Sequence, residues 1–318
     1  MPDSLSVATS ASATEPLRVV SVPRRPLEAR EVRVKVAAIG VNPVDWKMRS
    51  GGPLRFLHRF VGPSGPLVVG VDFAGEVIEA APDADLKVGA RVVGATDFSR
   101  GQLGSYATEV VVRDDQCALL PATVGFEAAA CLPVPGATAL RAFEVSKLSA
   151  GKRVLMLGAS GAVGLATLEL ARPLGARVVG VCSTRNVALV TSLGATALDY
   201  TRGEVFKEAA AHGPYHLVFN AVGTDRYPLA ACRPLLAPGG VIALIVVRGA
   251  DVPAIAFDGR VKSILGRPNR KNLEPLVAAL ARGELTTRVE ARFPLAEAEQ
   301  AHRLSEGGKV VGKVLLLP

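Results

Sequence analysis

The chain has 318 residues, of which 49% are hydrophobic and 21% charged, so a folded globular protein is expected and a disordered one is excluded. No apolar run reaches the roughly 18–20 residues that a membrane span requires. The net charge of +8 would suit an anionic partner, but the basic residues are scattered and not interleaved with aromatic ones, so nucleic-acid binding is not favoured.

The first seventeen residues, MPDSLSVATSASATEPL, contain no Lys or Arg and two acids. This composition argues against a secretory signal or transit peptide and predicts a frayed polar tail. The four cysteines contain no C-x-x-C pair, so neither a zinc knuckle nor a disulfide framework is predicted. A reducing, cytoplasmic location is therefore expected. The cysteines are Cys117, Cys131, Cys182 and Cys232.

Residues 17–115 contain short apolar runs broken by Gly, Pro and Asp, which predicts a β-rich, barrel-like sheet. A helical pattern over 124–145 follows, and its prolines mark a break between two helices. Strands and helices then alternate, which predicts a parallel, doubly wound sheet. The predicted strands are 153–157, 177–182, 196–200, 216–222 and 240–247; the predicted helices between them are 162–173, 186–194, 203–211 and 228–236. Helices over 273–283 and 295–306 and a last strand over 309–317 complete the chain.

The first strand of this alternation leads into Gly158-Ala-Ser-Gly161-Ala-Val-Gly164 and then a helix. The order strand, glycine loop, helix is typical of a dinucleotide site, because the helix N-terminus offers unpaired N–H groups to a pyrophosphate. Gly161 would let the phosphates approach the backbone, and Gly164 would let the helix pack on the strand. The spacing is G-x-x-G-x-x-G, with Ala159 where the strict pattern has Gly. The predicted contacts are Ser160, Gly161, Ala162, Val163 and Gly164.

The second strand of the unit ends in Cys182-Ser183-Thr184-Arg185 and carries no acid. An acid at this position would bind the ribose 2′-hydroxyl of NAD, whereas Arg attracts a 2′-phosphate. Ser183 can donate a hydrogen bond to the phosphate, and Arg185 can form a charge-assisted pair with it. The sequence therefore predicts NADPH, the alternative being an exposed loop Arg that opens the next helix.

The combination of motifs resembles the zinc-independent quinone oxidoreductases and alkenal/one reductases of the medium-chain dehydrogenase/reductase superfamily. The resemblance covers about residues 17–318 and implies a GroES-like catalytic domain built from both chain ends around a Rossmann domain, an α/β fold. The expected domains are residues 1–120, 121–270 and 271–318. The motifs are 41-VNPVDWKMRSG-51, 70-GVDFAGEV-77, 132-LPVPGATAL-140, 199-DYT-201 and 311-VGKVLL-316, together with the loop at 158–164.

The resemblance also bears on metal and reaction. Zinc-dependent relatives carry Cys where this chain reads Gly40-Val41-Asn42 and G-H-E where it reads Gly70-Val71-Asp72, and two acids without Cys or His make a poor zinc site. No metal is therefore expected. Without a Lewis acid, hydride transfer from NADPH to an electron-poor acceptor, a conjugated carbonyl or a quinone, is better supported than alcohol oxidation.

The resemblance assigns further residues to the site. Asn42 is expected to donate from its side-chain amide to a carbonyl oxygen of the acceptor, or else to shape only a turn. Lys47 could polarise the developing enolate or be a surface lysine, and Asp45 could be catalytic or structural. Tyr106 is a possible proton donor or a packing residue, and solvent could protonate the enolate. The expected contacts to the nucleotide outside the glycine loop and Ser183–Arg185 are Thr138, Tyr200, Ala221 and Val222.

The sequence also permits two other functions. One is a trans-acting enoyl reductase of polyketide or fatty-acid synthesis, and the other is an RNA-binding protein similar to lens-crystallin relatives. The small-molecule partner would be an enone, an enal or a quinone. A homodimer is expected, with the strand 240–247 as a candidate pairing edge.

Overall fold

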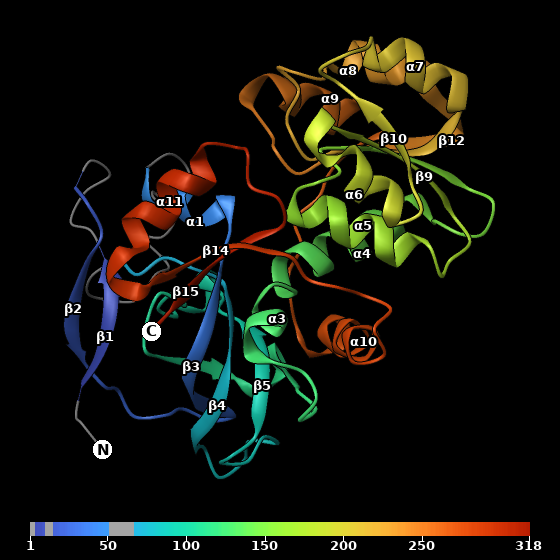
Figure 1. Cartoon of the computed structure of the whole chain (residues 1–318). Coiled ribbons are helices and arrows are strands. Elements are labelled where there is room, and N and C mark those ends of the chain that lie inside the picture. Colours follow the sequence, from blue (N-terminus) through green and yellow to red (C-terminus); the bar gives the residue numbers. More distant parts are fainter. Residues whose placement is uncertain (1–3, 10–14, 51–66) are drawn as a thin grey trace. The chain divides into compact units, whose positions relative to one another are not determined.

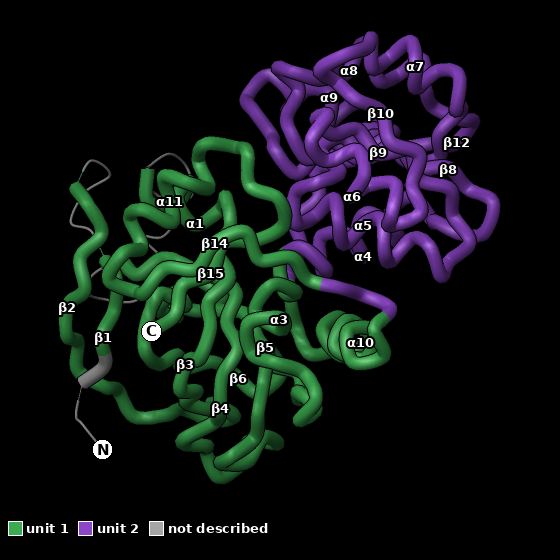
Figure 2. The backbone as a smooth tube through the Cα atoms, viewed as in Figure 1, with its two compact units in different colours: residues 1–134, 268–283, 287–318 green, residues 135–267, 284–286 purple. Residues whose placement is uncertain are grey.

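The structure is a computed structural model that describes residues 4–9, 15–50 and 67–318, arranged in two compact units (Figures 1 and 2). Unit 1 comprises residues 1–134, 268–283 and 287–318, and unit 2 comprises 135–267 and 284–286. The two ends of the chain therefore fold together, and the middle of the chain forms the second unit. The predicted division at residues 120 and 270 stays a prediction about domains.

A seven-stranded sheet is the frame of unit 1, with the order β14-β15-β3-β4-β5-β7 and with β6 also paired to β3. Its pairs are antiparallel except β14 and β15, which run parallel. The β-rich expectation for the N-terminal part is confirmed. The strands are β3 (Glu31–Val41), β4 (Asp72–Ala80), β5 (Arg91–Ala95), β6 (Glu109–Arg113), β7 (Cys117–Leu119), β14 (Val289–Pro294) and β15 (Lys313–Leu317).

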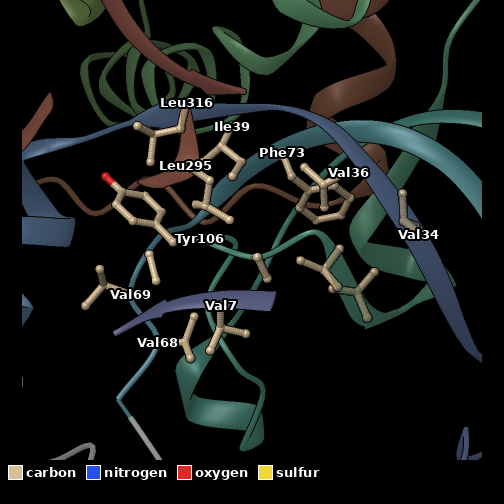
Figure 3. Close-up of a cluster of buried hydrophobic side chains, with 14 of the residues drawn as sticks. Val7, Val34, Val36, Ile39, Val68, Val69, Phe73, Tyr106, Leu295 and Leu316 are labelled. Atoms are coloured by element: carbon tan, nitrogen blue, oxygen red, sulfur yellow. The ribbon is translucent and has the colours of Figure 1, made fainter. Parts of the chain in front are cut away.

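The core of unit 1 lies on this sheet and is made mostly of Val, Leu and Ile side chains (Figure 3). Burial of these side chains is the main favourable contribution to folding of the unit. Ile39 and Phe73 come from neighbouring strands and are fully buried, and Leu295 and Ala301 from the C-terminal segment close the same cluster. The helices of unit 1 are α1 (Pro43–Arg49), α3 (Phe126–Ala130), α10 (Arg270–Ala281) and α11 (Ala298–Glu306).

The prediction of a frayed N-terminal tail is wrong for residues 4–9. They form β1 (Ser4–Thr9), which pairs antiparallel with β2 (Arg18–Pro23). On its other side, the Ala8 N–H donates to the Tyr106 carbonyl at 2.8 Å. Val7 is fully buried in the core cluster (Figure 3), so these long-range contacts outweigh the polar composition of the segment.

A six-stranded parallel sheet forms unit 2, in the order β10-β9-β8-β11-β12-β13. This is the strand order of a doubly wound dinucleotide-binding fold, so the predicted α/β class is confirmed. The strands are β8 (Arg153–Leu157), β9 (Arg177–Cys182), β10 (Thr196–Asp199), β11 (Tyr215–Asn220), β12 (Leu236–Leu244) and β13 (Val261–Ser263).

Helices cover both faces of this sheet. One buried cluster joins the sheet to α4, α5 and α6, and another joins it to residues of α7, α8 and α9. None of the helices in the described part of the chain is long and apolar enough to cross a membrane. The bounds are α4 (Pro133–Ser146), α5 (Ala162–Ala171), α6 (Val187–Ser192), α7 (Val205–His212), α8 (Leu229–Cys232) and α9 (Val252–Phe257).

Two details of unit 2 differ from the sequence prediction. The helix predicted over 228–236 ends as α8 at Cys232, followed by a short 3₁₀ turn, because residues 236–244 belong to β12. The strand predicted over 240–247 is not an edge, since Ile242 to Leu244 pair with Val261 to Ser263 of β13. The prediction that 240–247 is a free edge for pairing two copies is therefore wrong.

Candidate active site

The predicted catalytic residues Asn42 and Asp45 lie together where β3 ends and α1 begins. Pro43 takes the first position of α1, where a missing N–H costs nothing. Asp45 is fully buried, and its Oδ2 accepts from the Asn42 backbone N–H at 2.8 Å. Lys47 stands on the same short helix, half-buried, with its Nζ 5.4 Å from the ring centroid of Trp46.

Lys313 joins these residues from the opposite end of the chain. It begins β15, where Val314 faces Val41 in an antiparallel register, so Lys313 comes level with Asn42. The side chain is 3% exposed; its Nζ donates to Asn42 Oδ1 and, at 2.9 Å, to Asp72 Oδ2. A Cβ on Gly40 would lie 2.8 Å from Lys313 Cε, so glycine at this position makes room for the lysine.

The orientation of the Asn42 amide follows from its partners. Lys313 can only donate, so it faces Oδ1, and the carboxylate of Asp72 requires an N–H group. Asn42 Nδ2 donates to Asp72 Oδ2 at 3.0 Å and to the Gly40 carbonyl at 3.1 Å. Both amide N–H groups, which the sequence analysis offered to an acceptor carbonyl, are therefore donated within unit 1.

Asp72 connects the cluster to the start of α4. Its Oδ1 accepts from the Val134 N–H at 3.0 Å, one of the N–H groups that a helix leaves unpaired in its first turn. Its Oδ2 accepts from both Asn42 and Lys313. The carboxylate is fully buried and is thus paired with a cation and two further donors, which is the condition for keeping a charge inside a protein.

A second arm of the cluster runs from Asp45 to α11. The Tyr106 hydroxyl lies 3.3 Å from Asp45 Oδ2 and 3.0 Å from His302 Nε2, and all three side chains are fully buried. The rings of Tyr106 and His302 meet edge to face. Asp45 Oδ1 and His302 Nδ1 are buried without a hydrogen-bond partner within the described residues. His302 belongs to no sequence motif that would predict a role for it.

Burial controls the protonation of this arm. It raises the pKa of Asp45 to about 8, opposed by the bond from the Asn42 N–H, and it also raises the pKa of Asp72, opposed by Lys313. Burial lowers the pKa of His302 to about 4 and, with the Asp45 carboxyl, holds the pKa of Tyr106 well above its usual range. At neutral pH the arm therefore contains a protonated carboxyl group and a neutral imidazole.

When the pH is raised from 6.5 to 8, the free energy of unfolding of the Asp45→Asn variant is expected to fall less than that of the wild type. Folding raises the pKa of Asp45 from 3.8 to about 8. The protonated carboxyl group therefore contributes its full share to the free energy of unfolding below pH 3.8, and this contribution is lost as the pH rises through 8. The lowered pKa of His302 acts in the opposite sense, but only below pH 6.5. The wild type should therefore lose about 2 kcal/mol over this interval.

Urea unfolding at pH 6.5 and at pH 8 measures this difference. Asp72, whose folded-state pKa is also raised, is present in both proteins, so its contribution cancels in the comparison. An equal decline in wild type and variant would show that Asp45 is ionised in the folded protein at pH 6.5.

In unit 2, the glycine loop connects β8 to the N-terminus of α5. Gly158 has a φ of +93°, which favours glycine, and Gly161 is the residue before the first turn of α5. A Cβ on Gly164 would lie 2.4 Å from the Gly158 carbonyl oxygen, so only glycine allows this approach of helix and loop. A Cβ on Gly161 would meet only the Gly158 carbonyl oxygen, at 3.6 Å. This is the open backbone that a pyrophosphate requires.

Other predicted nucleotide contacts lie beside this loop. A Cβ on Gly158 would lie 3.0 Å from Val222 and 3.7 Å from Ala221, so the end of β11 flanks the loop. Val222 is 40% exposed, and its N–H donates to Asn220 Oδ1. Thr138 is instead buried in α4, close to Gly266, whose Cβ would lie 2.3 Å from the Thr138 hydroxyl oxygen.

The end of β9 is connected to the glycine loop through a residue that the sequence analysis did not assign. The Asn186 side chain donates to Ser160 Oγ at 2.9 Å and to Ser183 Oγ at 3.3 Å. The Tyr200 N–H donates to the Cys182 carbonyl, which places Tyr200 beside the same strand end. Ser160, Ser183 and Tyr200 therefore gather at the carboxyl edge of β8, β9 and β10, and Arg185 follows Ser183 in a 3₁₀ turn.

Within residues 4–9, 15–50 and 67–318, no three His, Cys, Asp or Glu side chains gather closely enough to hold a metal ion. All four cysteines are buried free thiols. Burial raises the pKa of each of these thiols, so none has the thiolate character of a ligand or nucleophile. The expectation of a metal-free site stays a prediction.

Comparisons with known proteins identify the family to which the chain belongs. A family model described as alcohol dehydrogenase GroES-like domain matches residues 28–122, and one described as zinc-binding dehydrogenase matches residues 193–316. The chain is 32% identical to a chloroplast envelope quinone oxidoreductase homolog of Arabidopsis thaliana, over 95% of this chain and 94% of that one. It is 31% identical to a 2-methylene-furan-3-one reductase of Solanum lycopersicum, over 91% and 72%.

Among solved structures, the quinone oxidoreductase from Coxiella burnetii superposes with a TM-score of 0.87 at 27% identity, covering 99% of this chain and 98% of that one. The GroES-like unit and the parallel Rossmann sheet, together with these relatives, show that the protein is an oxidoreductase. The chain belongs to the medium-chain dehydrogenase/reductase superfamily, in the branch of the quinone oxidoreductases and the 2-methylene-furan-3-one reductases.

Proposed function

We propose that the protein is an NADPH-dependent, zinc-independent reductase that transfers hydride to the C=C bond of α,β-unsaturated carbonyls or to quinones. The observation that carries the proposal is the carboxyl edge of the unit 2 sheet, where an open glycine loop stands beside a strand end that carries Ser183 and Arg185 instead of an acid. Two relatives whose names describe quinone and furanone reduction support the acceptor class.

The residues of unit 2 fit the nucleotide. The N-terminus of α5 with Ser160, Gly161, Ala162, Val163 and Gly164 would receive the pyrophosphate, because its first N–H groups have no helical partner. Ser183, Arg185 and Tyr200 would hold the 2′-phosphate, and Thr138, Ala221 and Val222 would border the nicotinamide. When bound, NADPH supplies the hydride, and the protein orients it.

In unit 1, Asn42 is the proposed contact for the acceptor oxygen. One of its N–H groups is donated to the Gly40 carbonyl, so donation to a substrate would share or replace that bond. Lys313 fixes the amide and adds a positive charge next to it, which would favour negative charge on a nearby oxygen. Lys47 would polarise the same oxygen, and Asp45 would hold the turn that carries Asn42.

Zinc independence is part of the proposal. The donor set around Asn42 consists of an amide, a carboxylate and a lysine ammonium, and a fixed ammonium is a poor neighbour for a divalent cation. Treatment with a chelator is expected to leave turnover unchanged, and loss of turnover that added zinc restores would reject this part. A homodimer and a cytoplasmic location also remain proposals.

The Arg185→Asp variant is expected to raise the KM for NADPH by about 10- to 100-fold while changing the KM for NADH by less than about threefold. The guanidinium would otherwise pair with the 2′-phosphate, and an acid would repel it. Steady-state kinetics with both cofactors measures the ratio. Arg177→Asp, at the exposed amino end of β9, is the control for net charge. An equal loss with NADPH and NADH would contradict the assignment.

A further inference from the structure

Arg226 lies in the loop between β11 and α8, and nothing in the sequence pattern singled it out. Its guanidinium carbon is 4.3 Å from the ring centroid of Tyr200 and 5.9 Å from that of Tyr227. A guanidinium at the first distance is attracted to the face of the ring. The loop after β11 and the turn after β10 are thereby joined, although β9 and β8 separate these two strands in the sheet.

The two tyrosines differ in burial, and this fixes where the guanidinium sits. Tyr227 is 4% exposed and packs edge to face on Phe206 in the core, whereas Tyr200 is 38% exposed. Arg226 is itself exposed. The guanidinium therefore spans from a rigid core residue to the solvent-facing ring, at the strand end that leads to Ser183 through the Tyr200–Cys182 hydrogen bond.

Two acids in this region pair with arginines other than Arg226. Asp225, the preceding residue, pairs with Arg248 at 2.6 Å. Asp199, the acid that ends β10, accepts hydrogen bonds from Thr184 and Thr201 and lies 3.8 Å from Arg202. Within the part of the chain that the structure describes, no carboxylate lies within ion-pair distance of Arg226.

Asp199 also sets a requirement for any anion that binds here. Thr184, which stands between Ser183 and Arg185, donates to Asp199 Oδ2 at 2.6 Å, so a negative charge lies close to the proposed phosphate position. Arg202 offsets this charge only in part, because its guanidinium is 3.8 Å away and its side chain is 76% exposed, so Asp199 would still oppose the charge of Arg185. A second cation on the same rim would restore a net positive charge for a doubly charged phosphate.

We propose that Arg226 is a second cation of the 2′-phosphate site and contributes to selection of the phosphorylated nucleotide. This rests on the proposed preference for NADPH and adds a residue from a different loop. A planar guanidinium can stack on Tyr200 and still present N–H groups at its edge to phosphate oxygens, which a lysine cannot do with the same geometry.

Binding of 2′-AMP and of 5′-AMP to the full chain, measured by isothermal titration calorimetry, tests the proposal without relying on turnover. Arg226→Gln is expected to weaken 2′-AMP binding about tenfold and 5′-AMP binding less than about twofold. Arg226→Lys should give an intermediate loss. Arg177→Gln is the matched control, because Arg177 is an exposed arginine at the amino end of β9, away from the carboxyl edge of the sheet, and it should change neither affinity by more than about twofold.

Three results would overturn the inference. Equal weakening of 2′-AMP and 5′-AMP by Arg226→Gln would assign the residue to the adenine or to the shape of the loop. A loss of 2′-AMP affinity in Arg177→Gln as large as in Arg226→Gln would show that only the net charge of the protein matters. A wild type that binds 2′-AMP no more tightly than 5′-AMP would reject the proposed NADPH preference together with the inference. Thermal unfolding of each variant shows whether it is folded.

Discussion

Replacing Lys313 with Met is expected to lower the free energy of unfolding by about 3–5 kcal/mol, the cost of leaving one partner of a buried ion pair uncompensated. Asp72 would keep its burial and its bonds to Asn42 and Val134 but would lose its only cation at ion-pair distance within the described residues. The Asn42 amide would lose the donor that fixes its orientation. Urea unfolding at constant pH measures the change.

Two further variants separate a buried pair from a general effect of charge. Lys313→Met combined with Asp72→Asn removes both charges, so it should be more stable than Lys313→Met alone. Lys271→Met removes an exposed lysine from α10 in the same unit and is expected to change stability by less than about 0.5 kcal/mol. A Lys313→Met protein as stable as wild type would show that the cluster does not hold a charged pair.

The second large effect is expected at the glycine loop, where two substitutions of the same size should both weaken NADPH binding but differ in their cost to stability. Gly164→Ala places a Cβ 2.4 Å from the Gly158 carbonyl oxygen and 2.5 Å from the Ala159 carbonyl, so backbone must move. Overpacking of this kind costs about 3 kcal/mol, and unit 2 should unfold at a lower urea concentration. Affinity for NADPH should fall with it, because α5 shifts away from the loop.

Gly161→Ala is expected to fold with a loss of no more than about 1 kcal/mol, because its Cβ meets no atom closer than 3.6 Å. Its methyl group would nevertheless occupy the space left for the pyrophosphate, so the Kd for NADPH should rise about tenfold or more. Fluorescence titration with NADPH and urea unfolding separate the two variants. A Gly161→Ala protein with normal affinity would place the pyrophosphate elsewhere.

The Rossmann half of the fold was readable from the sequence because its signals are local. The run from Arg153 to Gly164 contains a strand, a tight loop and a helix start in twelve consecutive residues, and each step follows from residue type. The absence of an acid at the end of β9 can likewise be read from consecutive residues, 182–185.

The buried polar cluster could not be predicted in this way. Lys313 and Asn42 are 271 residues apart, and only the antiparallel register of β15 on β3 brings them level. In the sequence, Lys313 directly precedes an apolar run, 313-KVLLL-317. A lysine at the start of such a strand is usually exposed, so this pattern does not predict a buried lysine. His302 was equally hard to predict, because its helix carries the exposed charges of Arg303 and Glu306, and only the packing of α11 on the core shows that His302 faces inward.

For the N-terminal strand, the prediction from composition was wrong, because residues 4–9 form a strand and not a frayed tail. Polar and apolar residues alternate from Ser4 to Val7, as in a strand with one buried face, but Ala8 and Thr9 are buried together with Val7. Polar composition alone predicted a tail, whereas pairing with β2 and the hydrogen bond from Ala8 to Tyr106 stabilise the strand. The short alternation from Ser4 to Val7 indicates a strand, but only these long-range contacts account for the burial of Ala8 and Thr9.

The most direct test of the central proposal is oxidation of reduced nicotinamide cofactor by the purified protein against a panel of acceptors. The panel is a 2-alkenal, an enone, 1,4-benzoquinone and 9,10-phenanthrenequinone, each with NADPH and with NADH, before and after treatment with a chelator. We expect turnover with at least one acceptor, a higher kcat/KM with NADPH than with NADH, and no change after chelation. Absence of turnover with all four acceptors, or turnover that requires zinc, would contradict the account.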